Sequence, residues 1–208
     1  MTQLQQLTST VAITACWGAV VLIWVIGALY NAARGPARGS RPAPRSFGGA
    51  VTSVVVIIVV VAVGRLVPGQ DWHALRVDSP WVTVLGLAAL LASTAFTLWA
   101  RLALGTMWSM DAAVKQGHRL RTDGPYGITR HPIYTGMLGM LLGSLLLAGV
   151  GRSLLVLLAG IVFFEVRIRE EERLMTATFP EEYARYRQRV PQLVPGLGGF
   201  RRHRAQDR

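Results

Sequence analysis

The chain has 208 residues, of which 51% are hydrophobic and 16% are charged, and its formal net charge is +11. Soluble domains average roughly 45–50% hydrophobic and about 25% charged residues, so apolar residues have replaced charged ones and intrinsic disorder is excluded. A positive net charge would also suit a nucleic-acid binder, but residues 1–33 and 46–64 carry no charged side chain, which is typical of a membrane protein.

Apolar segments recur along the whole chain. Four of them reach about the 20 residues that a helix needs to cross the hydrocarbon of a bilayer, and the last is shorter. The second segment is rich in β-branched residues, but its length and lack of charge favour a helix, which satisfies its backbone hydrogen bonds internally in lipid. We therefore expect an all-α integral membrane protein with about five transmembrane helices, the fifth continuing as a helix with a charged end. The apolar segments lie at about 7–30, 47–67, 81–100, 132–151 and 153–164.

Basic regions recur on one side of the expected bundle. The loop 31–46 contains four arginines and no acid, residues 101–131 are also basic, and ten arginines follow from Arg167 onward. Because positively charged loops stay in the cytoplasm, these regions and the C-terminus are expected there. The composition resembles that of a bacterial protein, so the predicted location is the inner membrane.

Residues of the types that commonly ligate metals are scattered along the sequence. Cys16 is the only cysteine and lies within the first apolar segment. His73, His118, His131 and His203 have no carboxylate pair at ligand spacing, so we expect no metal site.

Two glycines four residues apart, Gly139 and Gly143, lie in the fourth apolar segment. This G-x-x-x-G spacing allows two helices to approach closely. We expect packing within the chain, against the fifth segment.

The stretch GHRLRTDGPYGITRHPIYTG at residues 117–136 precedes the fourth apolar segment. Pro132 suits the first position of a helix, which makes His131 the residue that caps it. Free amides at this helix start, together with Arg130, would hold an anion, and the rings of Tyr126 and Tyr134 would accept a cation. A sulfonium amino acid carries both charges. The alternative is a capping histidine beside interfacial tyrosines that bind no ligand.

A second polar stretch, EVRIREEERLMTATFPEEYARYRQRVPQLVP, begins at residue 165. Arg167 and Glu171 stand four residues apart and therefore share one helical face at the membrane boundary. Ionisable residues at that depth indicate a function. The other glutamates of the stretch are interpreted as a solvated, charged helix surface; they are Glu170, Glu172, Glu181 and Glu182.

The sequence GPYGITRHPIYTG, followed after a hydrophobic hairpin by EERLMTATFPEEYARYRQRVPQLVP, resembles the isoprenylcysteine carboxyl methyltransferase family and its bacterial relatives. The resemblance covers about residues 101–195 and reaches into a wider group that includes phospholipid methyltransferases. It implies a membrane enzyme that transfers a methyl group from S-adenosylmethionine to a lipophilic acceptor entering from the bilayer. The chain departs from the family at Pro180, where glycine is usual.

The resemblance also assigns roles to individual residues. It places Arg167 toward the carboxylate of the acceptor, so a carboxylate ranks first among possible acceptors. The implied cofactor pocket faces the cytoplasm and is formed by the third loop, the start of the fourth helix and the C-terminal helix. The implied cofactor-binding residues are His118, Arg119, Leu120, Arg121, Tyr126, His131, Pro132, Ile133, Tyr134 and Glu171.

The expected organisation is three N-terminal helices in residues 1–100, a methyltransferase-like region in 101–195 and a basic tail in 196–208. Membrane lipids are expected partners, and nucleic acid is not. Two other functions are kept open. One is a sterol-reductase-like membrane enzyme that uses NADPH, and the other is a membrane protein without catalytic activity that binds anionic lipid or a protein partner.

Overall fold

The computed structural model describes residues 3–33, 79–105, 120–149 and 151–193. These residues form helices and turns and contain no strand, as the sequence predicts. The second apolar segment, 47–67, lies outside the described residues. The helices are α1 (Gln3–Ala33), α3 (Pro80–Leu104), α4 (Pro125–Ile128), α5 (Pro132–Ala148), α6 (Gly151–Thr178) and α7 (Pro180–Arg189).

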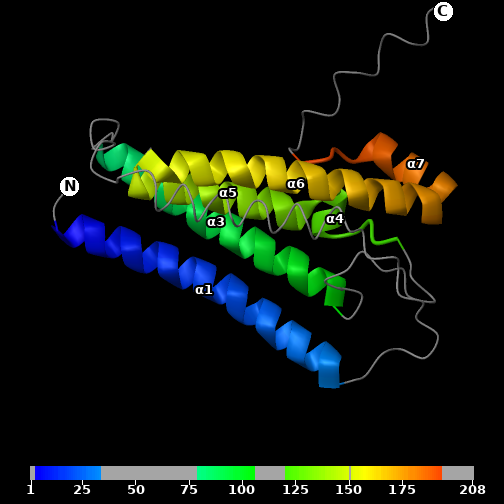
Figure 1. Ribbon diagram of the computed structural model, residues 1–208, viewed down its shortest axis with the longest axis horizontal. Coiled ribbons are helices and arrows are strands. Elements are labelled where there is room, and N and C mark those ends of the chain that lie inside the picture. The colour runs from blue at the N-terminus through cyan, green and yellow to red at the C-terminus, as the bar shows by residue number, and fades with distance from the viewer. Residues whose placement is uncertain (1–2, 34–78, 106–119, 150, 194–208) are drawn as a thin grey trace, which may run out of the picture.

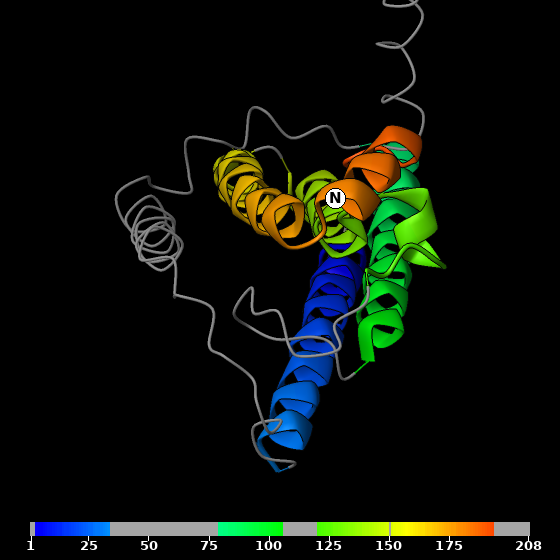
Figure 2. The ribbon, with the colours of Figure 1, turned by 90° about the vertical axis from the view of Figure 1, so that its right-hand side faces the viewer.

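Three long helices run side by side, with α5 between α3 and α6 (Figures 1 and 2). α1 packs mainly against α3 and crosses it at an angle (Figure 1). The short helices α4 and α7 lie at the end of the bundle where α5 begins and α6 ends (Figure 1). This arrangement gathers the described parts of the two polar sequence stretches, residues 120–136 and 165–193, at one end.

Apolar side chains cover much of the outside of the bundle. Segments Gln3–Tyr30 and Pro80–Leu104 are long and apolar enough to cross a membrane, with mean hydropathies of 2.2 and 1.8. Leu22 on α1 and Trp81 on α3 are 60% and 76% exposed. Such exposure is unfavourable in water and suits helices surrounded by lipid.

The fifth apolar segment continues without a break into the charged stretch, as predicted. α6 runs from Gly151 to Thr178, so its first half is apolar and its second half carries the ionisable residues. Pro180, the position that departs from the family, begins the separate helix α7 after the N-cap residue Phe179. A proline is tolerated in the first turn because the amide it lacks would have no helical partner.

The glycines of α5 contact α3, so the predicted packing against the fifth segment is wrong. A Cβ atom on Gly143 would lie 2.7 Å from the amide nitrogen of Leu90 and 3.0 Å from the carbonyl oxygen of Gly86. Gly139 faces the side chain of Ser93 in the same interface. Small residues on both helices allow this close approach, whereas spacing on α5 alone does not specify which helix fills the space.

A methyl group at Gly143 should destabilise the fold more than one at Gly139. The Gly143→Ala methyl meets the backbone of α3, whereas the Gly139→Ala methyl meets the Ser93 hydroxyl, which is able to rotate. We expect Gly143→Ala to cost about 1–3 kcal/mol of stability, seen as a lower midpoint of thermal unfolding in detergent. Equal midpoints for the two variants would contradict this contact.

Candidate active site

The start of α5 is held by the segment that follows α7. The Arg130 and His131 amides donate to the carbonyl oxygens of Pro191 and Gln192 at 2.9 and 3.2 Å, and the Thr129 hydroxyl donates to Gln192 at 2.7 Å. His131 occupies the N-cap position, as predicted, although its side chain makes no capping hydrogen bond, and Pro132 begins the helix. The Arg130 and His131 amides are therefore bound within the protein and not available to an anion.

Glu171 of α6 is the centre of a polar cluster at the boundary between the apolar and charged halves of the helix. It accepts a hydrogen bond from the Tyr134 hydroxyl. Arg167 Nη2 lies 3.7 Å from Glu171 Oε1, and His131 Nδ1 lies 3.6 Å from Glu171 Oε2. Arg167 and Glu171 thus share one face, as their spacing predicts. The Glu171 side chain is still 27% exposed, so the cluster is accessible.

The neighbouring Glu172 binds the basic residues around it, so its interpretation as a solvated surface residue is wrong. Its carboxylate lies 2.7 Å from Arg130 Nη2, 3.4 Å from His131 Nε2 and 3.7 Å from Arg187 Nε. Only 15% of its side chain is exposed. One signal was present in the sequence, since adjacent residues of a helix point about 100° apart and the two glutamates therefore face different partners.

The guanidinium of Arg130 is bound by protein groups and is not available to an anionic ligand. Besides Glu172, its guanidinium donates to the carbonyl oxygens of Arg187 and Val190 at 3.1 and 3.0 Å. It therefore ties the start of α5 to α6 and to the end of α7.

His131 lies between the two glutamates. Burial by itself would lower its pKa, but hydrogen bonds to Glu171 and Glu172 raise the pKa above the ordinary value of 6.5. Burial of Glu172 opposes its charge, yet the hydrogen bond from His131 and the positive charge of Arg130 lower its pKa to about 2. The cluster therefore favours a protonated imidazole beside a charged Glu172 carboxylate.

The pH dependence of stability follows from the raised pKa of His131. The protonated imidazole contributes its full stabilisation below pH 6.5, and this contribution is lost as the pH rises through the raised pKa of the folded state. We expect the thermal unfolding midpoint in detergent to fall with rising pH above 6.5, and to fall less in His131→Gln. The contribution of Glu172, by contrast, is lost only as the pH falls below 4.5 toward 2. Equal slopes above pH 6.5 in wild type and His131→Gln would show that His131 is not responsible.

The remaining expected cofactor residues have varied environments. The Tyr134 ring stacks on His131 and Phe164, with centroids 5.8 and 5.0 Å apart. Tyr126 is buried, and its carbonyl oxygen accepts a hydrogen bond from the Tyr186 hydroxyl at 2.6 Å. Burial, reinforced by the charge of Glu171, raises the pKa of Tyr126 and keeps its phenol neutral. Pro132 is buried and Ile133 is half-buried at the start of α5.

The segment before α4 is only partly described. Leu120 packs against the cluster of Tyr183, Tyr186 and Val190, and Arg121 forms an ion pair with Asp123 at 2.8 Å. His118 and Arg119 lie outside the described residues. The structure thus brings together His131, Tyr134, Arg167 and Glu171, while Leu120 and Arg121 contact other residues.

In the described part of the chain, no three His, Cys, Asp or Glu side chains gather as metal ligands.

Comparison with known proteins identifies the region that contains this cluster. Residues 84–177 match the isoprenylcysteine carboxyl methyltransferase (ICMT) family. The match includes the start of α5 and the charged half of α6. Over these residues the chain is similar to the ICMT family. The resemblance seen in the two sequence motifs is therefore confirmed.

Similar proteins of known sequence carry names of more than one kind. The Cobalt-zinc-cadmium resistance protein CzcN of Cupriavidus metallidurans is 28% identical over 147 residues, which are 70% of this chain and 63% of the relative. Methanethiol S-methyltransferase 2 of Bradyrhizobium diazoefficiens is 42% identical over 93 residues, or 44% of this chain and 34% of the relative. The chain thus spans less than two thirds of the length of these curated relatives.

A solved structure shares the fold. The eukaryotic intramembrane Ras methyltransferase ICMT matches with a TM-score of 0.54 at 20% sequence identity, over 90% of this chain and 69% of the other. The all-helical architecture of this chain is therefore that of an ICMT-type membrane protein.

Proposed function

We propose that this protein is a membrane methyltransferase that transfers the methyl group of S-adenosylmethionine to a carboxylate of a lipophilic acceptor. The observation that carries the proposal is the cluster of Tyr134, Arg167 and Glu171 at the boundary between the apolar and charged halves of α6. The family match supports it, because the matched region includes both the α5 residue and the α6 residues of this cluster. We assign the catalytic region to residues 101–195 and place it on the cytoplasmic side of a bacterial inner membrane.

The described residues fit such a cofactor. Glu171 is bound on one side by Tyr134 and Arg167, yet enough of its carboxylate is exposed to accept hydrogen bonds from ligand hydroxyl or ammonium groups. The rings of Tyr134 and Phe164 stack beside it and form an apolar wall. When bound, S-adenosylmethionine supplies an electrophilic methyl carbon on a sulfonium. Tyr126, with its neutral phenol, and the His118–Arg121 segment complete the proposed pocket.

Arg167 would orient the acceptor. Its side chain is 21% exposed and pairs with Glu170 at 3.4 Å and with Glu171 at 3.7 Å. A guanidinium presents a planar fork of donors that matches a carboxylate. A carboxylate nucleophile needs no base, so the task of the protein is to align the two reactants and to exclude water. The apolar half of α6 lies directly beside Arg167, which suits an acceptor that reaches the site from the bilayer.

A thiol acceptor is the second candidate, because a relative with 42% identity over part of the chain is named as a methanethiol S-methyltransferase. The same purified protein distinguishes the two acceptors when it is assayed for methyl transfer to an isoprenylcysteine carboxylate and to a small thiol. Transfer to the thiol alone would reject the carboxylate assignment and retain the methyltransferase.

The proposed cofactor is tested by calorimetric titration of the detergent-solubilised protein with S-adenosylhomocysteine. We expect saturable binding to the wild type and a loss of at least about tenfold in affinity in Glu171→Ala, because a carboxylate that accepts ligand hydrogen bonds contributes on the order of 1.5–3 kcal/mol. Glu181→Ala, an exposed glutamate on α7, is the matched control and should bind like the wild type.

The other functions predict different titrations. Binding of NADPH in place of S-adenosylhomocysteine would favour the reductase. If the folded wild type binds neither S-adenosylhomocysteine nor NADPH, the methyltransferase is rejected and a lipid- or partner-binding protein is favoured. A thermal unfolding curve for each variant separates loss of binding from loss of fold.

A further inference from the structure

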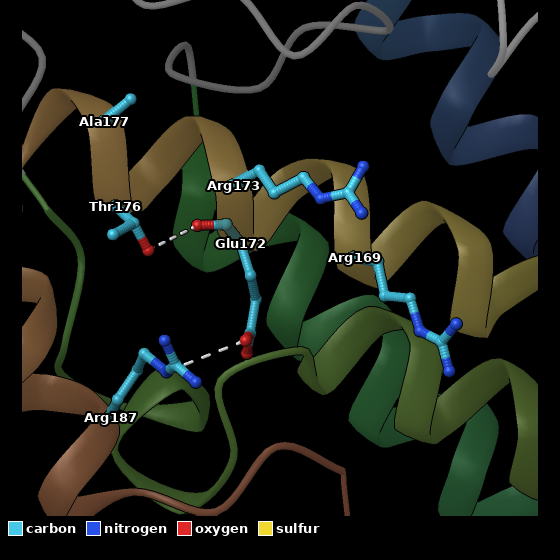
Figure 3. A pocket seen from close by; sticks show the side chains of 6 residues that line it. All are labelled: Arg169, Glu172, Arg173, Thr176, Ala177 and Arg187. Carbon is cyan, nitrogen blue, oxygen red and sulfur yellow. Dashed lines mark hydrogen bonds and ion pairs between the residues drawn. The ribbon is translucent and has the colours of Figure 1, made fainter.

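An open groove lies between α6 and α7, outside the cluster around Glu171. It encloses about 530 Å³. Figure 3 shows Glu172 reaching from α6 toward Arg187 of α7, while Arg169 and Arg173 extend from α6 in different directions. The residues that line it are Arg169, Glu172, Arg173, Thr176, Ala177 and Arg187.

The groove is positively charged. Three of its lining residues are arginines, and one is a glutamate. That glutamate, Glu172, lies 2.7 Å from Arg130, which does not line the groove, and at the longer distance of 3.7 Å from Arg187, which does. Arg169 pairs with Glu165 at 2.9 Å, but both side chains are exposed, so this ion pair contributes little and exchanges easily with another anion. An anionic ligand would therefore find several guanidinium donors.

Arg169 and Arg173 lie on one face of α6, and nearer the start of the helix the same face is apolar. Leu158, Ile161 and Val162 are 50%, 45% and 60% exposed. Their spacing of three and four residues continues through Glu165 to Arg169 and Arg173, so all of them share one face of the helix. Val162 and Arg169 are separated by seven residues, or about 10 Å along the axis. An exposed apolar stripe thus leads straight into the basic groove.

We propose that this groove binds the phosphate headgroup of an anionic phospholipid whose acyl chain lies along the apolar stripe of α6. The stripe provides the contact for the chain, and the arginines provide charge-assisted hydrogen bonds to the phosphate. Water-soluble phosphate would use the arginines but not the stripe. The site is separate from the proposed methyl-transfer chemistry, although Glu172 borders both and would place the lipid next to the candidate active site.

Lipid binding is tested on the full chain in detergent micelles by native mass spectrometry. The probes are phosphatidylglycerol and phosphatidylcholine with the same acyl chains. We expect phosphatidylglycerol to bind roughly tenfold more tightly, and Arg169→Gln/Arg173→Gln to abolish this preference. The control is Arg185→Gln/Arg189→Gln, which removes the same charge from exposed positions of α7 that do not line the groove and should keep the preference.

Three results would overturn the proposal. They are equal binding of the two lipids by the wild type, an equal loss in the groove and control variants, and binding of inorganic phosphate as tight as that of phosphatidylglycerol. If the double variant unfolds, the single variant Arg173→Gln at its exposed position serves in its place. None of these measurements depends on methyl transfer, so failure here leaves the proposed function unaffected, and failure of the proposed function leaves this site unaffected.

Discussion

The Glu172→Gln variant is expected to lose about 3–5 kcal/mol of stability, which is a fall of roughly 6–20 °C in the midpoint of thermal unfolding. The substitution keeps the size of the side chain but removes the charge that faces Arg130 and His131, whose side chains are 9% and 7% exposed. These two groups would then lie close together without the carboxylate between them. Breaking a buried ion pair on one side is costly because the remaining charge is left in a region of low polarity.

The same variant should bind S-adenosylhomocysteine more weakly, since Glu172 anchors the segment that carries His131 and Tyr134 against α6. Glu165→Gln is the matched control. It removes a glutamate from the same helix, but its pair with Arg169 is exposed, so its midpoint should change by only a degree or two. If the unfolding midpoint of Glu172→Gln is as high as that of Glu165→Gln, the ion pairs of Glu172 do not stabilise the fold and Glu172 behaves as a surface residue.

The Arg167→Lys variant is expected to lower kcat/KM for methyl transfer to a carboxylate acceptor by about 10²-fold. Lysine keeps the positive charge but replaces the planar fork of donors with a single ammonium, so the acceptor is held less accurately. Affinity for S-adenosylhomocysteine should change little, because Glu171 keeps its hydrogen bond from Tyr134. The loss would therefore appear in methyl transfer and not in cofactor binding.

Arg169→Lys is the control for this experiment, since Arg169 lies two residues further along α6 and its side chain is 66% exposed. It should retain wild-type methyl transfer. A similar loss in both variants would indicate a general effect of arginine replacement on α6. Loss of S-adenosylhomocysteine binding in Arg167→Lys would instead place Arg167 in the cofactor pocket and not at the acceptor.

Features that depend on neighbouring residues in the chain were predictable. Proline at position 132 determines where α5 begins, because its ring suits the first turn of a helix and leaves His131 as the cap. A spacing of four residues brings Arg167 and Glu171 together on any helix. The absence of charge over long segments likewise indicates helices in lipid without reference to any tertiary contact.

Contacts between distant segments were not predictable. The partner of the glycines on α5 proved to be α3, because the small residues of two helices have to match. Glu172 was interpreted as solvated because nothing in its own helix shows that Arg130, 42 residues earlier in the chain, lies against it. Residues 191–192 accept hydrogen bonds from the amides of Arg130 and His131, a contact that no local sequence pattern indicates.

The sequence by itself determined the all-helical membrane character of this protein, its resemblance to the ICMT family, and the two motifs that form the candidate site. Periodicity, capping and the length of apolar segments depend on residues that are close in the sequence, so they are predicted from the sequence directly. Only the tertiary structure decided which of two adjacent glutamates faces the accessible cluster and which is enclosed by Arg130, His131 and Arg187. That choice depends on how α5, α6 and α7 pack together, and packing joins residues that the linear sequence keeps apart.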